Sequence, residues 1–244
     1  VDMQHVGCRI YTFLTTLFYC LEACAEFEKK IVVLDRPNPA GRPVEGNRLD
    51  MDWHSFVGAA PIPMRHGLTL GEAALWYKDH KKLIVDLDVV EMEGYKPGKD
   101  LDSVWPRERT WVNPSPNIPR LTCTQMYSGT VLLEGTRLSE GRGTTLPLEM
   151  FGAPGLDAVE ILLKMKDIYP DVNKSCILRP CHFEPTFHKH QNHLCEGLQI
   201  HVDHPKYKLE EFKPYRPICA FLKAVQITQK NKSLWRDPPY EYET

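Results

Sequence analysis

The stretch of residues 11–34, YTFLTTLFYCLEACAEFEKKIVVL, decides the fold class. Apolar side chains recur in its first part at the three- and four-residue spacing of one helix face, which predicts an amphipathic helix over residues 11–26. The uninterrupted apolar run at residues 31–34 predicts a strand buried on both faces. Residues 1–6 are predicted to be the end of an earlier strand. Strand, helix and strand in this order predict a parallel sheet in an α/β fold.

Outside this stretch the sequence predicts a mixed α/β chain without an internal repeat. Alternation of apolar and polar residues predicts strands at residues 83–90 and 197–202. Helices are predicted where a residue typical of a helix N-terminus precedes an apolar stripe. They cover residues 70–76, 158–168 and 218–227, and they begin after Thr69, Asp157 and Pro217.

Length and composition allow one large core or two modest ones, since the chain has 244 residues, of which 42% are hydrophobic and 25% charged. A formal net charge of -2 gives no overall electrostatic footprint for nucleic acid or an anionic membrane. The longest apolar run, residues 10–25, is interrupted by Glu22 and falls short of the roughly 18 residues of a membrane span. No leader is visible and the chain begins with Val1, so we expect a fragment or a processed product.

Residues 133–154, LEGTRLSEGRGTTLPLEMFGAP, predict the lining of a polar pocket. Glycines let the backbone approach a ligand, and ionised side chains crowded on loops are typical of binding sites. The alternative is an ordinary polar connection. The stretch has neither a GxGxxG pattern after a strand nor a glycine followed by Lys-Ser or Lys-Thr, so it is neither known phosphate loop. Its charged and hydroxyl side chains include Glu134, Glu140, Glu149, Arg137, Arg142, Thr136, Ser139 and Thr144.

A second polar segment follows the strand predicted at residues 31–34. Asp35, Arg36 and Asn38 stand beside prolines that stiffen the chain, and ligands of open α/β sheets bind beyond the carboxyl ends of the strands. The alternative is an Asp-Arg surface pair with an asparagine turn. Residues 105–119 contain four prolines and two tryptophans and are either a linker or a binding loop.

Cysteines and histidines are frequent between residues 176 and 195, which raises the question of a zinc site. Their spacing is irregular and lacks the usual CxxC and HxxxH pairs, so histidines on a polar loop are favoured over metal ligands. We expect no disulfide framework at this size and spacing, and no nucleophile stands on a recognisable elbow. The residues concerned are Cys176, Cys181, His182, His188, His190, His193 and Cys195.

Seven motifs together resemble one family. In chain order they are GCRIYTF, LDRPNP, VEG, FVGAAPIPMRHGLTLGE, NPSPNIP, YSGTVLLEGTRLSEGRGTTLPLEMFGAP and CEGLQIHV. With these motifs the chain resembles, from about residue 1 to 212, the NamZ family, formerly the domain of unknown function DUF1343. The members of that family are exo-β-N-acetylmuramidases, which release N-acetylmuramic acid from the non-reducing end of peptidoglycan fragments.

The resemblance implies a Rossmann-like parallel-sheet domain, incomplete at its N-terminus, over residues 1–120. A smaller α+β domain over residues 121–244 would follow, with the active-site cleft between the two. The implied activity is that of a glycoside hydrolase acting on muramic-acid-containing saccharides, with no cofactor and no metal. The resemblance to this family implies a secreted or periplasmic enzyme, although no signal peptide is visible in this chain.

Matched motif by motif, the resemblance also implies site residues. Glycosidases use two carboxyl groups, for which Glu134 is the first candidate and Glu149 the second. A lactyl carboxylate on the sugar would accept a two-pronged hydrogen bond from Arg142 or Arg65. The candidates for substrate binding are Asp35, Arg36, Asn38, Arg65, His66, Ser115, Asn117, Thr136, Ser139, Arg142 and Thr144.

Two departures from the family pattern bear on activity. Longer members carry, upstream of the start of this chain, a Glu-His-Gly loop that is a strong candidate for a catalytic carboxylate. His5 stands where the family typically has an aspartate. The alternative function is therefore a catalytically inactive, cell-wall saccharide-binding remnant. A nucleotide-binding domain is a third possibility, which the absence of a phosphate loop disfavours.

Overall fold

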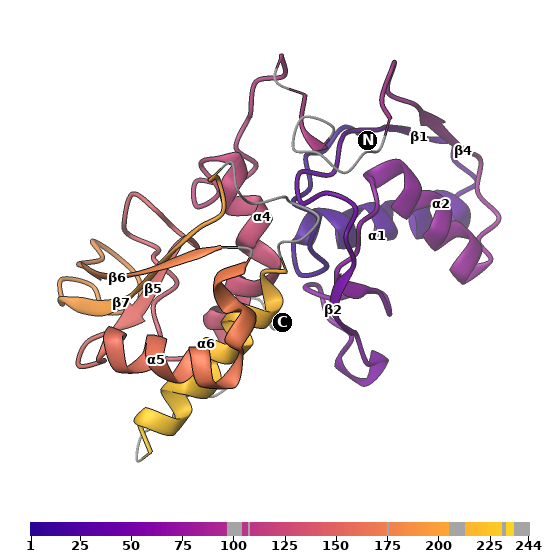
Figure 1. Cartoon of the computed structure of the whole chain (residues 1–244). Helices are drawn as coiled ribbons and strands as arrows, with labels where there is room; N and C mark the ends of the chain where they lie inside the picture. Colours follow the sequence, from indigo (N-terminus) through magenta and orange to yellow (C-terminus); the bar gives the residue numbers. More distant parts are fainter. Residues whose placement is uncertain (97–103, 107, 175, 205–212, 231–232, 237–244) are drawn as a thin grey trace. The chain divides into compact units, whose positions relative to one another are not determined.

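The computed structural model describes residues 1–96, 104–106, 108–174, 176–204, 213–230 and 233–236. The chain separates into two compact units, whose main segments are Val1–Thr110 and Trp111–Glu241 (Figure 1). The predicted boundary between residues 120 and 121 stays a prediction. In the part of the chain that the structure describes, no helix combines the length and apolar character needed to cross a membrane.

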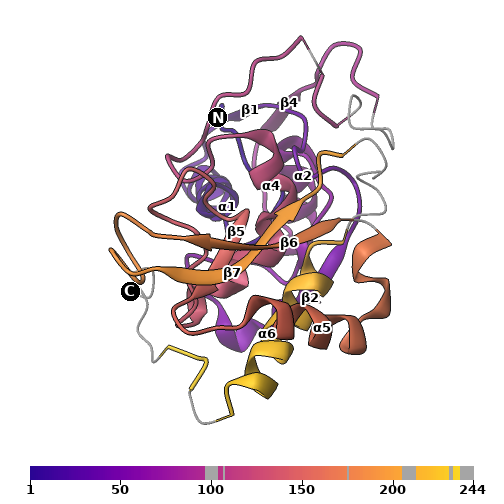
Figure 2. The same cartoon turned by 60° about the vertical axis from the view of Figure 1, so that its left-hand side comes forward.

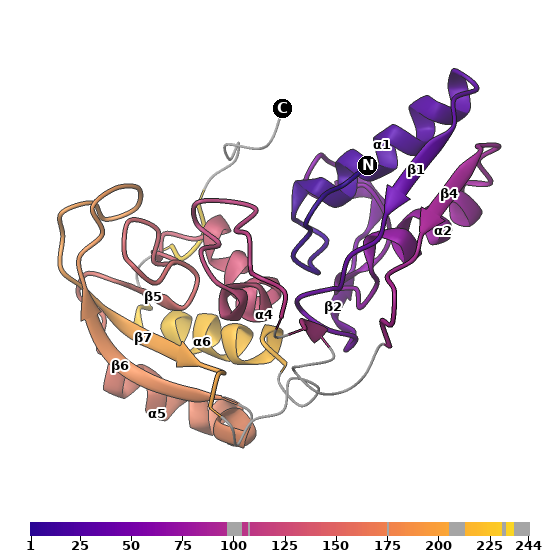
Figure 3. The ribbon, with the colours of Figure 1, turned by 90° about the horizontal axis from the view of Figure 1, so that it is seen from above.

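The first unit is built on a parallel pair of strands, β1 (Ile31–Leu34) and β4 (Leu87–Val90). Helices α1 (Thr12–Glu26) and α2 (Leu70–Lys81) lie beside these strands (Figure 3). The predicted helix, strand and parallel sheet are confirmed. The apolar stripe of α1 is buried in this core, where the Phe18 ring stacks on the Tyr77 ring of α2 with centroids 3.9 Å apart.

Three details of the strand predictions are wrong. The strand predicted at residues 83–90 is regular only over Leu87–Val90, since residues 83–86 form no strand. Val32 and Leu34 are exposed while Ile31 and Val33 are buried, because the described chain covers one face of β1 with helices and leaves the other open. Residues 1–6 form no regular strand. The main chain of Val1 nevertheless lies against β1: its ammonium nitrogen donates to the Val32 oxygen at 2.5 Å, and its oxygen accepts from the Leu34 nitrogen at 2.9 Å.

The connection between β1 and α2 carries a small antiparallel pair, β2 (Glu45–Arg48) and β3 (Pro63–Arg65), with a 3-10 turn at Met51–Trp53 between them. Thr69 caps α2 with the predicted capping box, since its side chain accepts from the Glu72 nitrogen and the Glu72 carboxylate accepts from the Thr69 nitrogen. Helix α2 therefore begins as predicted and continues beyond residue 76.

The second unit is an α+β structure with an antiparallel sheet in the order β5-β7-β6 (Figure 2). Helices α5 and α6 pack side by side, and α5 also contacts β6 and β7. The predicted helix after Asp157 and the strand at residues 197–202 are confirmed. The elements of this unit are α4 (Leu121–Thr130), η2 (Val131–Gly135), β5 (Met150–Ala153), α5 (Ala158–Ile168), η3 (Pro170–Lys174), β6 (Ile177–Phe183), β7 (Cys195–His201) and α6 (Tyr215–Thr228).

The strands β5 and β7 approach each other at two glycines. Gly152 and Gly197 are direct partners in the register, and a Cβ atom added to Gly197 would lie 2.0 Å from the Phe151 oxygen. Only a residue without a side chain fits there. Next to this pair, the Phe151 ring meets the Phe221 ring of α6 edge to face, with centroids 4.7 Å apart.

Candidate functional site

A row of alternating charges runs through the second unit. Arg142 contacts the Glu134 carboxylate at the end of η2, and its Nε lies 3.1 Å from Glu140 Oε1. The other oxygen of Glu140 accepts a hydrogen bond from Lys189 Nζ at 2.8 Å, and His188 Nδ1 lies 3.3 Å from Glu140 Oε1. The four charges in the order Glu134, Arg142, Glu140, Lys189 sum to zero.

Burial deepens along this row from Glu134, whose side chain is 23% exposed, to Glu140, which is fully buried. Burial alone would raise the pKa of Glu140, but His188 and Lys189 outweigh it and lower that pKa to about 2. Burial alone would lower the pKa of Arg142, but Glu134 and Glu140 outweigh it and raise that pKa above its ordinary value. Both groups are therefore ionised at neutral pH, and Glu134 is the carboxylate of the row that solvent reaches.

Glu149, the second candidate carboxylate, is in a different environment. It is only 2% exposed, and Arg120 donates to both of its oxygens, from Nε to Oε1 at 2.7 Å and from its terminal nitrogen to Oε2. Thr122 Oγ1 adds a contact to Oε1 at 3.3 Å. The hydrogen bond to Glu149 raises the pKa of Arg120. The chemistry open to Glu149 thus depends on whether Arg120 moves aside.

The candidate hydroxyls near the row bond within their own loop. Thr136 Oγ1 donates to the Leu133 oxygen at 2.8 Å, and Thr144 Oγ1 donates to the Gly141 oxygen at 2.6 Å. Ser139 Oγ accepts from the Gly141 nitrogen at 3.1 Å. These bonds fix the turns that present Glu134 and Arg142. Ser115 and Asn117 lie in the loop before α4, where the Asn117 nitrogen donates to Ser115 Oγ at 3.4 Å.

In the first unit, Asp35 holds the N-terminus of α2. Its Oδ2 accepts from Thr69 Oγ1 and its Oδ1 from the Gly71 nitrogen, both at 2.8 Å. Arg36 leaves this loop toward Asp2, with 2.6 Å between Nε and Oδ1. Asn38 is buried and ties the loop together, accepting from the Ala40 nitrogen and donating to the Leu68 oxygen.

Arg65 and His66 are buried in the same unit. The Arg65 guanidinium donates to the Ala40 oxygen, and burial lowers the pKa of Arg65 to about 10. Burial likewise lowers the pKa of His66 to about 4. The His66 ring stacks on that of His5 with centroids 5.6 Å apart, and the pKa of His5 is lowered well below its usual range by burial and by His66. Both imidazoles are therefore neutral near pH 7.

Three residues of these clusters were not predicted to contact the candidate carboxylates. Arg120 and Lys189 were not predicted as site residues, and His188 was considered only as a metal ligand. Arg120 lies 29 positions from Glu149 in the chain. Lys189 and His188 lie 49 and 48 positions from Glu140. No local spacing in the sequence signals contacts over such separations. The tertiary fold alone brings them together.

The cysteine and histidine segment shows no metal centre. In the described ranges, no three His, Cys, Asp or Glu side chains converge as ligands. The histidines have other neighbours: His182 lies 3.4 Å from Glu196, and His190 Nε2 lies 2.7 Å from the Arg137 oxygen. All eight cysteines are outside disulfides.

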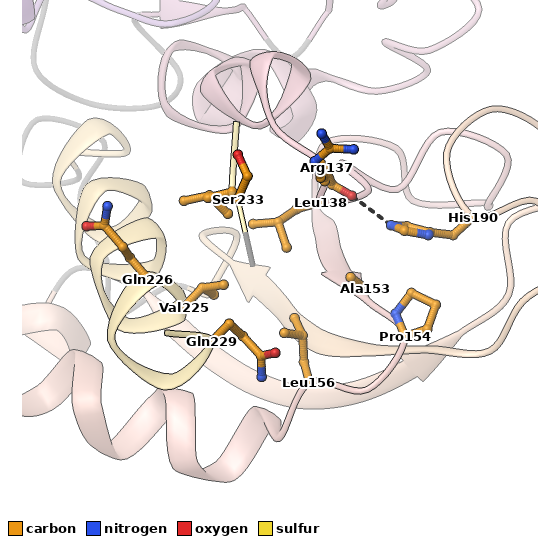
Figure 4. Close-up of a pocket in the computed structure, with 11 residues that line it drawn as sticks. Arg137, Leu138, Ala153, Pro154, Leu156, His190, Val225, Gln226, Gln229 and Ser233 are labelled. Atoms are coloured by element: carbon orange, nitrogen blue, oxygen red, sulfur yellow. Dashed lines mark hydrogen bonds between the residues drawn. The ribbon is translucent and has the colours of Figure 1, made fainter. Parts of the chain in front are cut away.

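A separate pocket of about 190 Å³ lies in the second unit (Figure 4). Its walls are mainly apolar, and the polar residues among them are Arg137, His190, Gln226, Gln229 and Ser233. None of the residues predicted to be catalytic or to bind substrate lines it. Arg137, Leu138, Ala153 and Pro154, from the stretch predicted to line a polar pocket, line this mainly apolar one. The pocket meets the charged row through Leu138, whose main-chain oxygen accepts from Lys189 at 2.9 Å.

The fold and the charged row define a two-unit α/β protein in which a part-exposed carboxylate, that of Glu134, lies beside Arg142. Two family models match the chain, namely "Exo-beta-N-acetylmuramidase NamZ, N-terminal" over residues 1–122 and "Exo-beta-N-acetylmuramidase NamZ, C-terminal" over residues 125–243. The chain belongs to the NamZ family, as its motifs predicted.

Proteins that are similar to this chain in sequence or structure belong to the same family. The chain is 41% identical over 210 residues to the peptidoglycan β-N-acetylmuramidase NamZ of Bacillus subtilis strain 168, covering 85% of the chain and 49% of that protein. Two crystal structures of DUF1343 family proteins from Bacteroides fragilis NCTC 9343 are similar at 29% identity. One has a TM-score of 0.81, and the match covers 94% of this chain and 58% of the Bacteroides chain. The other has a TM-score of 0.71 and matches 96% and 60%. The chain thus spans about half the length of the curated relative.

Proposed function

We propose that the protein is a glycoside hydrolase that releases N-acetylmuramic acid from the non-reducing end of peptidoglycan-derived saccharides. The observation that carries this proposal is the 41% identity to a peptidoglycan β-N-acetylmuramidase over 85% of the chain. Both family domains are matched, so the likeness extends over both units. No observation favours the inactive binding remnant.

Glu134 is the carboxylate that we assign to the reaction first. It is part-exposed at the end of the charged row, and a neighbouring guanidinium stabilises negative charge on a carboxylate. This environment suits a nucleophile, a base or a group that stabilises an oxocarbenium-like transition state. Glu149 comes second, because Arg120 occupies both of its oxygens.

The remaining candidates divide into two proposed roles. Arg142 reaches the surface beside Glu134 and is the better partner for the lactyl carboxylate, since Arg65 is fully buried. Most of the others are proposed to fix the loops of their own unit through the hydrogen bonds described above. They are Asp35, Asn38, Ser115, Asn117, Thr136, Ser139 and Thr144. His66 is proposed to act in the same way through its Nδ1, which accepts from the Leu68 nitrogen at 3.1 Å. Arg36 is proposed as a direct contact because its side chain is part-exposed.

The test measures release of 4-nitrophenol from its β-glycoside of N-acetylmuramic acid. It uses the 244-residue chain and the longest product that its gene encodes. In the active form, Glu134→Gln is expected to lower kcat by about 10³-fold or more, as removal of a glycosidase carboxylate does. Glu160→Gln on the exposed first turn of α5 is the matched control and should keep full activity.

The results of this test separate the catalytic role of Glu134 from the saccharide-binding alternative. Unchanged turnover in Glu134→Gln would remove Glu134 from the reaction and leave Glu149→Gln as the next variant. Failure of both forms of the protein to release 4-nitrophenol, while they bind free N-acetylmuramic acid in calorimetry, would replace the proposal by the saccharide-binding alternative.

A further inference from the structure

Lys189 is a buried lysine in the loop between β6 and β7, and the proposed function does not yet use it. Its side chain is only 10% exposed. The ammonium donates to Glu140 Oε2 at 2.8 Å and to the main-chain oxygens of Leu133, Glu134 and Leu138 at 2.8, 3.2 and 2.9 Å. An ammonium has three hydrogens, so four acceptors within this range satisfy it fully.

The position of these acceptors is informative. Leu133, Glu134 and Leu138 all belong to the segment that carries the candidate carboxylate, and one side chain from 51 to 56 positions away binds all three. Burial lowers the pKa of Lys189, while Glu140 opposes this shift. A buried charge is costly unless it is paired, so the contact with Glu140 is what makes this location of Lys189 tolerable.

The loop that delivers Lys189 has an unusual backbone. His188, His190 and Asn192 adopt positive φ angles of 70°, 57° and 57°, a conformation that costs energy for residues with a side chain. Thr186 anchors the loop, since its nitrogen and its hydroxyl both donate to the Gly143 oxygen at 2.9 Å. On the pocket side, His190 Nε2 lies 2.7 Å from the Arg137 oxygen (Figure 4).

We propose that Lys189 is a positioning residue for Glu134. Its charge neutralises Glu140, so that Arg142 is left to hold the Glu134 carboxylate, and its hydrogen bonds fix the main chain on either side of Glu134. Without Lys189, the buried Glu140 would draw Arg142 toward itself, because Arg142 would then be its strongest neighbouring cation. This inference rests on the proposed function, in which Glu134 takes part in glycoside hydrolysis.

The test compares three variants of the active form of the protein. Lys189→Met removes the charge, the double variant Glu140→Gln with Lys189→Met removes both members of the buried pair, and Lys174→Met removes an exposed lysine as the control. Steady-state cleavage of the 4-nitrophenyl glycoside gives kcat and KM, and calorimetry gives Tm. Lys189→Met should lower kcat by about 100-fold with KM within about threefold, since misplacement by about 1 Å has effects of this size.

The double variant separates positioning from simple loss of packing. Removing Glu140 as well frees Arg142 for Glu134, so the double variant should recover kcat by about tenfold or more over Lys189→Met. Its Tm should also exceed that of Lys189→Met, which we expect to lie about 5 °C or more below the parent. Lys174→Met should match the parent in both measurements.

Two results would overturn the inference: kcat of Lys189→Met within about twofold of the parent, or a folded double variant that is no faster than the single one. A parent protein that cleaves no muramic acid glycoside would refute the proposed function instead. In that case the order of the Tm values would still decide whether Lys189 neutralises Glu140, because that order does not depend on turnover.

Discussion

Arg120 forms an ion pair with the Glu149 carboxylate, which has almost no access to solvent. Replacing it by methionine leaves the buried Glu149 carboxyl without its two guanidinium hydrogen bonds. Because Arg120 itself is half-exposed and water can enter in its place, we expect a loss of about 2 kcal/mol in the free energy of unfolding, less than for a fully buried pair. Urea denaturation of Arg120→Met measures this loss.

The control for that measurement is Lys164→Met, which breaks an exposed ion pair with Asp167 on α5. Such pairs contribute about 0.5 kcal/mol or less. Equal stability of Arg120→Met and Lys164→Met would mean that Glu149 does not depend on Arg120.

Asp35 illustrates what the sequence can establish about a single residue. Its position after the apolar run at residues 31–34 correctly located it at the carboxyl end of a strand. Its acceptor oxygens, however, are bound by Thr69 and Gly71, 34 and 36 positions further along the chain. That contact arises from the packing of α2 on the strands, and no local pattern encodes it. The sequence therefore predicted where Asp35 lies but not what it binds.

At the level of elements, the contact between β5 and β7 depends on two glycines. Gly197→Ala would push a methyl group against the Phe151 oxygen, in a backbone-to-backbone contact that neither strand can relieve without separating. We expect a loss of about 3 kcal/mol or more in the free energy of unfolding, comparable to severe overpacking. Thermal and urea unfolding of the variant measure it.

Gly155→Ala provides the comparison for this prediction. Gly155 has a φ angle of 74° but no atom within 4 Å of its added Cβ, so the substitution carries only the conformational cost of about 1 kcal/mol. If both variants lose the same stability, then the close approach of β5 and β7 does not determine the effect.

Helices were predicted more completely than strands, for physical reasons. The stripes of α1, α5 and α6 repeat over three turns or more, and Thr69 and Asp157 mark helix starts with side-chain caps. Strand β6 was missed because Pro180 interrupts it. Proline is tolerated there since β6 is an edge strand of the sheet, and this position cannot be known before the order β5-β7-β6 is known.

At the level of the whole molecule, the two units should respond to acid in different pH ranges. In the first unit, burial holds the pKa of His66 at about 4, below its ordinary value of 6.5. The unfolded chain therefore binds a proton as the pH falls through 6.5, while the folded unit does not. Stability that is present above pH 6.5 is lost between pH 6.5 and 4, by about 3 kcal/mol.

The second unit should keep its stability in that range and lose it lower. The pKa of Glu140 is about 2 in the folded chain against an ordinary 4.5, so its contribution is present above pH 4.5 and is lost as the pH falls toward 2. Hydrogen exchange measured peptide by peptide from pH 7 to 3 should show residues 1–96 losing protection first. Simultaneous loss in both units, or earlier loss in residues 111–230, would contradict the assignment.

The family could be predicted from the sequence because its motifs are long and occur in order. The charged row could be predicted only in part: Glu134, Glu140 and Arg142 share one motif, whereas Lys189 comes from the loop between β6 and β7. Outside the row, Arg120 comes from the residue before α4 and pairs with Glu149. Side chains that meet across the fold leave no trace in the spacing of residues, and only the tertiary structure brings Arg120 to Glu149 and Lys189 to Glu140.

The open face of β1 has a practical consequence. Val32 and Leu34 are exposed, and Val90 of β4 is exposed as well. Leu34 and Val90 are direct partners in the register, while Asp88, opposite Val32, interrupts the apolar surface. Exposed apolar side chains of this kind attract one another in concentrated solution. We expect preparations of the chain to bind hydrophobic dyes while fully folded, to show a negative second virial coefficient, and to be handled best at low concentration or with a mild non-ionic detergent.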